Sequence, residues 1–212
     1  ETVITSIASV DDVAELHEFM LDEFLHESLN AAIALTREEA TQCYRDLIEH
    51  CVASGFSCVQ RNSEGRIVGM NMSSVVDYGV KTRQYYLTES KYPTRVQLSV
   101  DLLEALNENK WAGIPADVEQ LLYIEIVCVS PQYRNCGLAQ KLLDLSYKKA
   151  RAAGASGAFA ECTALPSQKL FGKTGYRVVQ EINLDEYLGE DGKPIFECSD
   201  GTTTAQLVFK RL

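Results

Sequence analysis

Apolar and polar residues alternate along the chain with the periods of both strands and helices. Short apolar runs, alternating or continuous, predict strands. These runs occupy residues 3–9, 56–61, 67–76, 121–129, 158–162, 176–183 and 205–210. Apolar residues spaced three and four apart predict helices. These stripes occupy residues 10–24, 36–53, 95–109, 138–151 and 167–173.

The order of these elements is a strand, two helices, two strands, three helix–strand pairs and a last strand. Neither an internal repeat nor a linker interrupts it. The run 121–129, LLYIEIVCV, is nearly continuous in apolar residues, which is typical of a strand in the centre of a sheet. The pattern predicts one α/β domain over residues 1–212 with a mixed sheet.

Local signals mark the ends of two of these elements. Thr36 and Glu39 have the spacing of a capping box, and Gly55 is a typical stop for the helix that begins there. The polar turn 62–65 joins two strand-like runs and predicts a β-hairpin. An acidic, turn-rich segment at 184–203 carries no signal for its role.

The net charge of the chain indicates which kinds of molecule it can bind. A formal net charge of −10 argues against nucleic-acid binding, which needs a basic surface. Acidic residues suit a cationic small molecule, although they also serve solubility. No apolar stretch approaches the roughly 20 residues of a membrane span. The first residues, ETVITSIASVDD, lack the features of a signal peptide, so we expect none here.

Seven cysteines give an odd count without a CxxC pair. This usage is typical of reduced thiols and favours a cytoplasmic location, with neither a disulfide framework nor a metal site. An acidic chain with one tryptophan and no long apolar face also predicts a monomer.

A turn between the strand 121–129 and the following helix is the best candidate for chemistry. Here Arg134, Gly137 and Ala139 precede or open a helix whose first N–H groups can bind an anion. Gly137 allows close approach of a phosphate. From these residues alone, a pyrophosphate site and a plain strand–turn–helix connection are equally good interpretations.

A resemblance separates the two. Arg134-x-x-Gly137-x-Ala139 resembles the Q/R-x-x-G-x-G/A signature of the GCN5-related N-acetyltransferase (GNAT) superfamily, and residues 167–176 resemble its second motif. Residues 24–30, FLHESLN, are similar to the FxxxEPLN stretch of insect-type arylalkylamine N-acetyltransferases, the dopamine N-acetyltransferase group. The resemblance implies a GNAT-like fold: a mostly antiparallel sheet of about seven strands, splayed at its central parallel pair and flanked by helices.

The resemblance also implies acetyl-CoA as cosubstrate. The pantetheine arm would pair with the backbone of Val127, Cys128 and Val129. The remaining residues implied to bind acetyl-CoA are Arg134, Asn135, Cys136, Gly137, Leu138, Ala139, Gln140 and Ser167.

Glu27 is the expected general base, because the resemblance places it at the cleft where the amine arrives. Its alternative role is to cap the segment that follows. Glu125, a charge within an apolar strand, is the second candidate base. By strand periodicity it shares a face with Tyr123, Val127 and Val129.

Thr163 and Ser167 match the positions of two serines that the family uses as a hydroxyl relay to the leaving thiolate. Ser167 could instead be the N-cap of its helix. Phe171 stands where the superfamily often has a tyrosine acid, and a phenyl ring donates no proton.

The implied activity is direct acetyl transfer, in a ternary complex, to a small arylalkylamine of the dopamine, serotonin or tryptamine type. Tyrosines at 78, 85, 86 and 92 are candidates for an aromatic-amine pocket. Polyamines, hydrazines or other small amines are the alternative acceptors. A non-catalytic acetyl-CoA-binding module is the alternative from another class, against which Glu27, Thr163 and Ser167 together argue.

Overall fold

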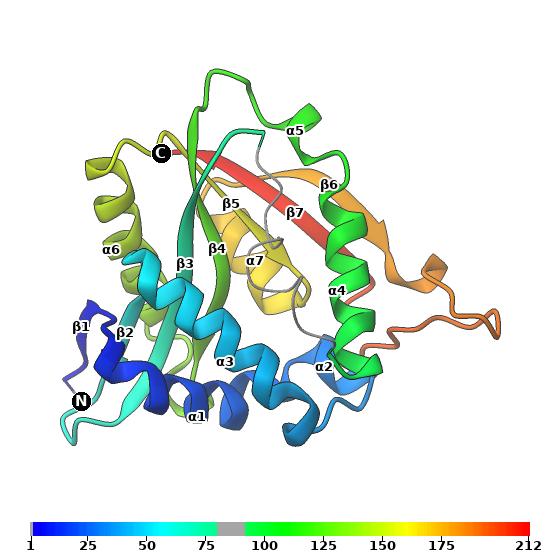
Figure 1. Ribbon diagram of the computed structural model, residues 1–212, viewed down its shortest axis with the longest axis horizontal. Helices are drawn as coiled ribbons and strands as arrows, with labels where there is room; N and C mark the ends of the chain where they lie inside the picture. Colours follow the sequence, from blue (N-terminus) through cyan, green and yellow to red (C-terminus); the bar gives the residue numbers. More distant parts are fainter. Residues whose placement is uncertain (1, 80–91) are drawn as a thin grey trace.

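The computed structural model describes residues 2–79 and 92–212, and one seven-stranded sheet organises them (Figure 1). The strands lie in the order β1-β2-β3-β4-β5-β7-β6, and only the β4–β5 pair is parallel. Their bounds are β1 Ile4–Ile7, β2 Cys58–Arg61, β3 Ile67–Asp77, β4 Gln120–Val129, β5 Gly157–Cys162, β6 Arg177–Asn183 and β7 Thr204–Arg211.

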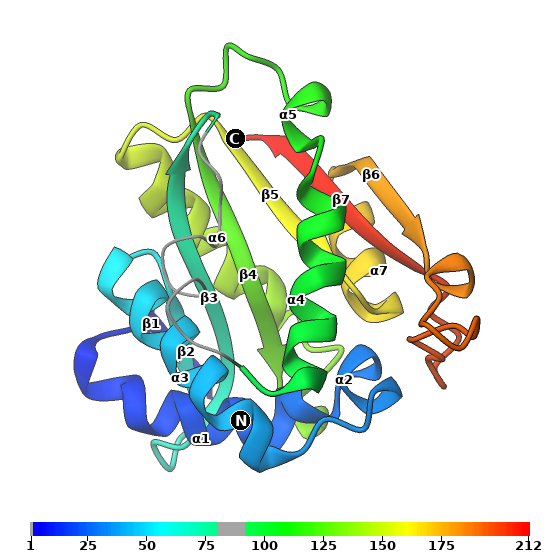
Figure 2. The ribbon, with the colours of Figure 1, turned by 45° about the vertical axis from the view of Figure 1, so that its right-hand side comes forward.

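Helices cover both faces of the sheet. In Figures 1 and 2, α1, α3 and α4 cross one face, whereas α6 and α7 lie behind the other. The α-helices are α1 Val13–Glu23, α2 Ser28–Ala32, α3 Arg37–Ser54, α4 Thr94–Asn107, α5 Lys110–Gly113, α6 Leu138–Ala152 and α7 Leu165–Lys173. Single 3-10 turns are η1 Val10–Asp12, η2 Phe24–His26, η3 Pro131–Tyr133 and η4 Leu184–Glu186.

The predicted fold class is confirmed, and so are most of the local signals. Thr36 and Glu39 form a capping box, and Gly55 ends α3 with φ +79°. The hairpin β2–β3 forms around the turn 62–65. The short helices α2 and α5 were not predicted, because four or five residues are too few to show a helical period.

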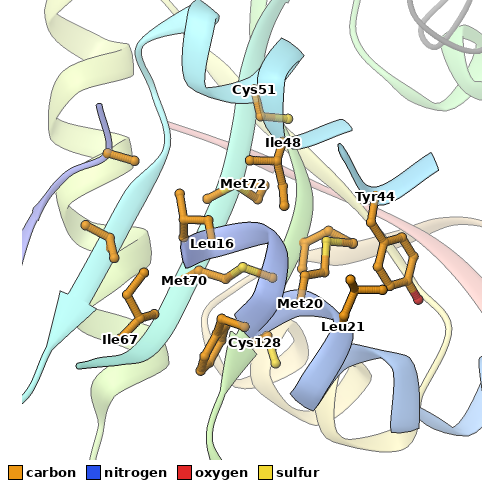
Figure 3. Packing of buried hydrophobic residues seen from close by; sticks show 14 of the residues in the cluster. Leu16, Met20, Leu21, Tyr44, Ile48, Cys51, Ile67, Met70, Met72 and Cys128 are labelled. Atoms are coloured by element: carbon orange, nitrogen blue, oxygen red, sulfur yellow. The ribbon is translucent and has the colours of Figure 1, made fainter. Parts of the chain in front are cut away.

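Three clusters of buried side chains fill the space between the layers. One lies between α1, α3 and the strands β2 to β4, and Figure 3 shows Leu16 and Met20 of α1 among Ile48 of α3 and Met70 and Met72 of β3. A second packs α4 on β4, β5 and β7, and a third packs α6 and α7 on the opposite face. The sheet is therefore buried on both sides near its centre.

The parallel pair at the centre separates after four residue pairs. β4 and β5 pair from Leu121 with Gly157 to Ile124 with Ala160, and the described parts of the two strands pair no further. The next residues on the two strands are Glu125 and Glu161. The predicted splay is therefore present, and it opens at two carboxylates.

The prediction for the face on which Glu125 lies was wrong in part. Ser73 of β3 pairs with Ile124 and Met72 with Ile126, so Glu125 is an extra residue in a bulge. The bulge breaks the two-residue alternation, because Ile126 packs with α1 and α3 whereas Val127 packs with the cluster of α6. Glu125 therefore does not share its face with Val127. It lies on the face covered by α3, because the thiol of Cys51 in α3 donates to its Oε1.

We predict that Gly157→Ala destabilises the protein by about 1–3 kcal/mol, the usual effect of overpacking a core. A Cβ at Gly157 would lie 2.7 Å from Val118 Cγ1 and 2.8 Å from Phe209 Cε2. Urea unfolding measures the change. Gly172→Ala is the control, because a Cβ in this helical position meets nothing within 4 Å. Equal stability of both variants would contradict the packing described here.

Candidate functional site

A pocket of about 800 Å³, part of it open solvent, lies where β4 and β5 separate. Its walls come from the segment from α1 to α3, from α4 and from the two strands. Most lining side chains are apolar, among them Phe24, Leu29, Tyr44, Val100 and Leu103. The lining also contains three carboxylates, those of Glu27, Glu125 and Glu161, together with Thr163. A few polar groups in an apolar cavity are typical of a small-molecule site.

Glu27 is held at this pocket by the short turn η2 and the helix after it. It is the N-cap of α2, and its Oε2 accepts a hydrogen bond of 3.2 Å from the N–H of Leu29. Its other oxygen, Oε1, is buried and has no hydrogen-bond partner in residues 2–79 and 92–212. Capping and an available oxygen are therefore compatible, because they use different oxygens of one carboxylate.

The surroundings of Glu27 change its acidity. Burial of the carboxylate raises its pKa to about 7, the carboxylate of Asp200 adds to this rise, and the Leu29 N–H opposes it. Asp200 lies in the segment 184–203, where Ser28 Oγ donates a hydrogen bond of 2.7 Å to its Oδ1. This acidic segment thus brings a second negative charge next to Glu27, a role that its sequence did not indicate.

The other two carboxylates of the pocket are fixed by neutral donors. Ser74 Oγ donates to Glu125 Oε1 at 3.1 Å, and the Cys51 thiol donates to the same oxygen at 3.2 Å. Tyr123 Oη donates to Glu161 Oε2 at 2.8 Å, and Asn107 Nδ2 donates to Glu161 Oε1. These hydrogen bonds hold the two carboxylates in defined orientations at the pocket.

Sequence reasoning did not single out Glu161. The available signal was the same as for Glu125, a charge within an apolar strand, here GAFAEC. Two of the four tyrosines expected at the pocket, Tyr78 and Tyr92, do not line it. The Tyr78 ring lies tilted against Trp111 with the ring centroids 4.7 Å apart, and Tyr92 donates to Asp46. Tyr85 and Tyr86 lie outside the described residues.

Thr163 and Ser167 lie on opposite sides of the start of α7. Thr163 follows β5 and lines the pocket. Ser167 lies inside α7, whose N-cap is Ala164, so the interpretation of Ser167 as an N-cap was wrong. Its hydroxyl donates to Ala164 O at 2.8 Å. Phe171 is buried against Tyr176 in the cluster of α6 and α7.

The turn before α6 has the geometry of an anion site. Gly137 is the N-cap with φ +74°, it supplies no side chain to cap the helix, and a Cβ there would meet nothing within 4 Å. Asn135, with φ +61°, also has a left-handed backbone. Gln60 Nε2 donates to Leu138 O at 3.0 Å and fixes the helix start. The start of α6 therefore has open space at Gly137 and no side-chain cap, which fits the binding of a pyrophosphate by the first N–H groups of the helix.

The other proposed acetyl-CoA contacts lie beside this turn. Val127, Cys128 and Val129 follow the last residue of β4 that pairs with β5, so within the described strands this edge of β4 carries no partner. Arg134 is exposed, and its Nε donates to Val129 O at 3.1 Å. Asn135 and Cys136 are exposed, whereas Ala139 and Gln140 are half-buried on the first turn of α6. The structure therefore places an unpaired strand edge next to the helix N-terminus.

Within residues 2–79 and 92–212, no three His, Cys, Asp or Glu side chains are grouped so that they could hold a metal ion. None of the helices described is long and apolar enough to cross a membrane.

Comparisons with known proteins agree with this geometry. The model of the acetyltransferase (GNAT) family matches residues 18–176. Arylalkylamine N-acetyltransferase 2 from Aedes aegypti superposes with a TM-score of 0.83 at 21% identity, covering 100% of this chain and 99% of that one. A mosquito arylalkylamine N-acetyltransferase-like protein, 5b, gives a TM-score of 0.85 at 19% identity, covering 100% of both chains.

A third solved structure, a Drosophila melanogaster polyamine N-acetyltransferase that forms N-acetylagmatine, gives a TM-score of 0.80 at 18% identity over 100% of both chains. No curated protein sequence matches the chain. At these identities the similarity to solved structures shows the fold.

We predict that Glu27→Gln stabilises the protein relative to the unsubstituted chain, and more so as the pH rises. The pKa of Glu27 is about 7 in the folded state, above its ordinary value of 4.5. As the pH rises, the unfolded chain therefore loses this proton before the folded protein does. The free energy of unfolding of the unsubstituted protein falls by up to about 3 kcal/mol between pH 4.5 and 7. The amide that replaces the carboxyl group in the variant does not titrate in this range. The stability difference should grow over this range and then level off.

Urea unfolding at successive pH values measures this difference. Glu190→Gln, at an exposed position in the segment 184–203, is the matched control and should give a flat difference. A flat difference for Glu27→Gln as well would mean that the Glu27 carboxylate is not buried.

Proposed function

The chain belongs to the acetyltransferase (GNAT) family, and on this premise we propose that it transfers the acetyl group of acetyl-CoA directly to the nitrogen of a small primary amine. The observation that carries the proposal is Glu27 Oε1, a buried carboxylate oxygen without a partner in the described part of the chain, on the wall of a pocket. A base of this kind can take the proton that an ammonium must lose before its nitrogen attacks.

Acetyl-CoA supplies the acetyl group as an activated thioester. The N–H groups of Gly137 to Gln140 would hold its pyrophosphate, and Arg134 would add positive charge at the rim. The unpaired edge of β4 from Val127 to Val129 would hold the pantetheine arm as an added strand. A backbone N–H near Val129 would stabilise the negative charge that develops on the thioester oxygen.

Glu27 suits the removal of the amine proton near neutral pH. With a pKa of about 7, it is ionised above that pH and remains basic enough to accept a proton. Glu125 is the second candidate base, but its Oε1 already accepts two hydrogen bonds. The proposal therefore assigns the proton to Glu27.

The leaving thiolate needs a proton from another group. Thr163 lines the pocket and carries a hydroxyl, whereas Phe171 carries none and is buried. We assign Thr163 as the donor nearest the pocket, with Ser167 behind it. A relay through Ser167 requires its hydroxyl to leave Ala164 O, which it contacts at 2.8 Å.

The acceptor is proposed to be an arylalkylamine of the dopamine, serotonin or tryptamine type. The pocket wall supports this class, because Phe24 and Tyr44 meet edge-to-face at 6.0 Å and could pack on an aromatic ring. Two solved structures described as arylalkylamine N-acetyltransferases or similar to them share the fold of this chain. Amines with several cationic groups are the second candidate, favoured by Glu125 and Glu161 and by the polyamine enzyme among the similar structures.

A cytoplasmic monomer is the proposed form of the enzyme. None of the seven cysteines forms a disulfide in the structure, which supports a reducing compartment.

A thiol-release assay with acetyl-CoA and a panel of amines tests the proposal directly. Turnover of at least one of dopamine, serotonin, histamine, agmatine and spermidine is expected. If the protein binds acetyl-CoA but acetylates no amine, it is a binding module and the proposed activity is wrong.

We predict that Glu27→Gln lowers kcat by about 10²–10⁴-fold, the usual contribution of a positioned general base. Binding of acetyl-CoA should not change, because Glu27 lines a pocket that includes none of the α6 turn residues proposed to hold the pyrophosphate. The rise of kcat/KM through pH 7 should also disappear in the variant. Glu190→Gln should keep both rate and pH profile. Normal turnover of Glu27→Gln would mean that Glu27 is not the general base and that Glu125 or water accepts the proton.

We predict that Gly137→Glu weakens acetyl-CoA binding at least tenfold, because it places bulk and negative charge where the pyrophosphate is proposed to bind. Titration calorimetry measures the affinity. Gly192→Glu is the matched control: Gly192 has φ +75°, close to the +74° of Gly137, and similarly open surroundings. Both variants therefore carry the same backbone strain. Equal affinities in the two variants would remove the pyrophosphate assignment.

A further inference from the structure

The end of the segment 184–203 contacts the first turns of two helices that border the pocket. Ser28 Oγ, at the start of α2, donates a hydrogen bond of 2.7 Å to Asp200 Oδ1. The N–H of Leu165, the first residue of α7, donates a hydrogen bond of 3.0 Å to Thr202 Oγ1. Figures 1 and 2 both show this segment, drawn in orange to red, beside α2. The chain from Asp200 to Thr202 therefore joins two helices that are distant in the sequence, and we call it the interhelix bridge.

The interhelix bridge is a compact turn with its own hydrogen bond. Asp200 Oδ1 also accepts from the N–H of Thr202 at 3.0 Å. Gly201 between them has φ +82°, a left-handed conformation that glycine adopts without strain. Thr202 is buried, and β7 begins at Thr204. The turn is therefore anchored in the sheet at its C-terminal end, and its two side chains bind different helices.

Helix α7 lacks a cap of its own, and Thr202 supplies one. The N-cap of α7 is Ala164, which has no polar side chain, and Pro166 has no N–H. The N–H of Leu165 is one of the first donors of a helix, which have no intrahelical partner, and Thr202 Oγ1 accepts from it. The interhelix bridge therefore fixes where α7 begins.

The two helices carry or adjoin the groups proposed to move protons. Glu27 is the N-cap of α2 and precedes Ser28, whose hydroxyl Asp200 holds. Thr163 lines the pocket just before α7, and Ser167 lies in the first turn of that helix. A shift of either helix start would move one of these groups relative to the other.

We infer that Asp200 and Thr202 are positioning residues for acetyl transfer, which set the separation between the group that takes the amine proton and the group that protonates the thiolate. Asp200 holds Glu27 through Ser28, and Thr202 holds Thr163 through the start of α7. The inference rests on the proposed function, which assigns those two groups. A displacement of about 1 Å at a reacting group can lower a rate about 100-fold, so small shifts of either helix matter.

Asp200 also acts on Glu27 through its charge. The titratable groups that act on the Glu27 carboxylate from elements packed around it are Tyr44 of α3, Cys128 of β4, and Cys198 and Asp200 of the segment 184–203, and Glu125 and Glu161 line the same pocket. Burial raises the pKa of the phenol and of both thiols, so these three groups are neutral near pH 7. Burial, which is slight at this exposed residue, opposes ionisation of Asp200. Hydrogen bonds from Ser28 and Thr202 outweigh it and lower the pKa of Asp200, so its carboxylate stays ionised while Glu27 titrates.

Steady-state kinetics of matched variants tests the role of Thr202. Thr202→Val removes the hydroxyl but keeps the shape, and it should lower kcat by about tenfold or more while the KM for acetyl-CoA stays unchanged. Thr202→Ser keeps the hydroxyl and should keep most of kcat. Thr203→Val, at the exposed neighbouring position, is the control and should have no effect. Ser28→Ala removes the donor at the other end of the bridge and should also lower kcat alone, which covers the case in which Thr202→Val does not fold.

The pH dependence of the rate tests the role of Asp200. Asp200→Asn keeps an oxygen that accepts both hydrogen bonds but removes the charge, so the pKa of Glu27 should fall by about 0.5 and the rise of kcat/KM should move to lower pH. A 13C NMR titration of the Glu27 carboxyl group measures the same shift without turnover. Asp191→Asn is the matched control and should change neither value. Asp191 Oδ1 accepts from the N–H two residues further on at 3.1 Å, as Asp200 Oδ1 does at 3.0 Å.

The outcomes separate these roles from the proposed function. Normal kcat in Thr202→Val and Ser28→Ala, or an equal loss of kcat in Thr202→Ser and Thr202→Val, overturns the positioning while the acetyltransferase proposal stands. A parallel loss of kcat and acetyl-CoA affinity in these variants indicates a general structural role and overturns it too. An unchanged pKa of Glu27 in Asp200→Asn overturns the role of the Asp200 charge. If the unsubstituted protein acetylates no amine, the proposed function fails, and the positioning role, which is defined by the reaction, fails with it.

Discussion

The separation of β4 from β5 is the constraint on which the rest of the structure depends. The parallel pair forms four residue pairs and ends at Ile124 and Ala160. Continued pairing would bring Glu125 and Glu161 side by side, and like charges at neighbouring positions of a sheet destabilise it. A bulge at Glu125 already distorts β4 here. Because the strands separate, the backbone of β4 beyond Ile124 keeps a free edge, and a pocket opens between the two halves of the sheet.

The proposed chemistry at this opening depends on Glu27, a carboxylate whose pKa is raised by burial. Glu27 reaches the pocket because the turn η2 ends there and α2 begins, so its position follows from its role as N-cap. Burial and Asp200 raise its pKa to about 7. The segment 184–203, which carries Asp200, is tied to α2 through Ser28. One local arrangement therefore positions the proposed base, leaves one of its oxygens without a partner in the described residues and raises its pKa to about 7.

The sequence predicted those features that depend on local spacing. The turn at Gly137, the capping box at Thr36 and the central strand ending at Val129 are all encoded within a few residues, and each lies where expected. Glu27 was found only through a family resemblance. The pattern of apolar and polar residues gave wrong predictions where contacts between distant segments determine the structure. The bulge at Glu125 depends on the pairing with β3, and α7 begins two residues before the predicted Ser167. Glu161 and Asp200 become informative only when the fold brings them to Glu27.

A crystal structure with a bisubstrate analogue, in which the sulfur of CoA is joined through the acetyl group to an amine, tests the central claim most directly. The account predicts that the pyrophosphate lies at the N-terminus of α6 and the pantetheine along the free edge of β4. It also predicts that the amide nitrogen lies within roughly 2.6–3.2 Å of Glu27 Oε1, or one water away from it. An analogue bound outside the gap between β4 and β5, or with its nitrogen directed away from Glu27, would contradict the account.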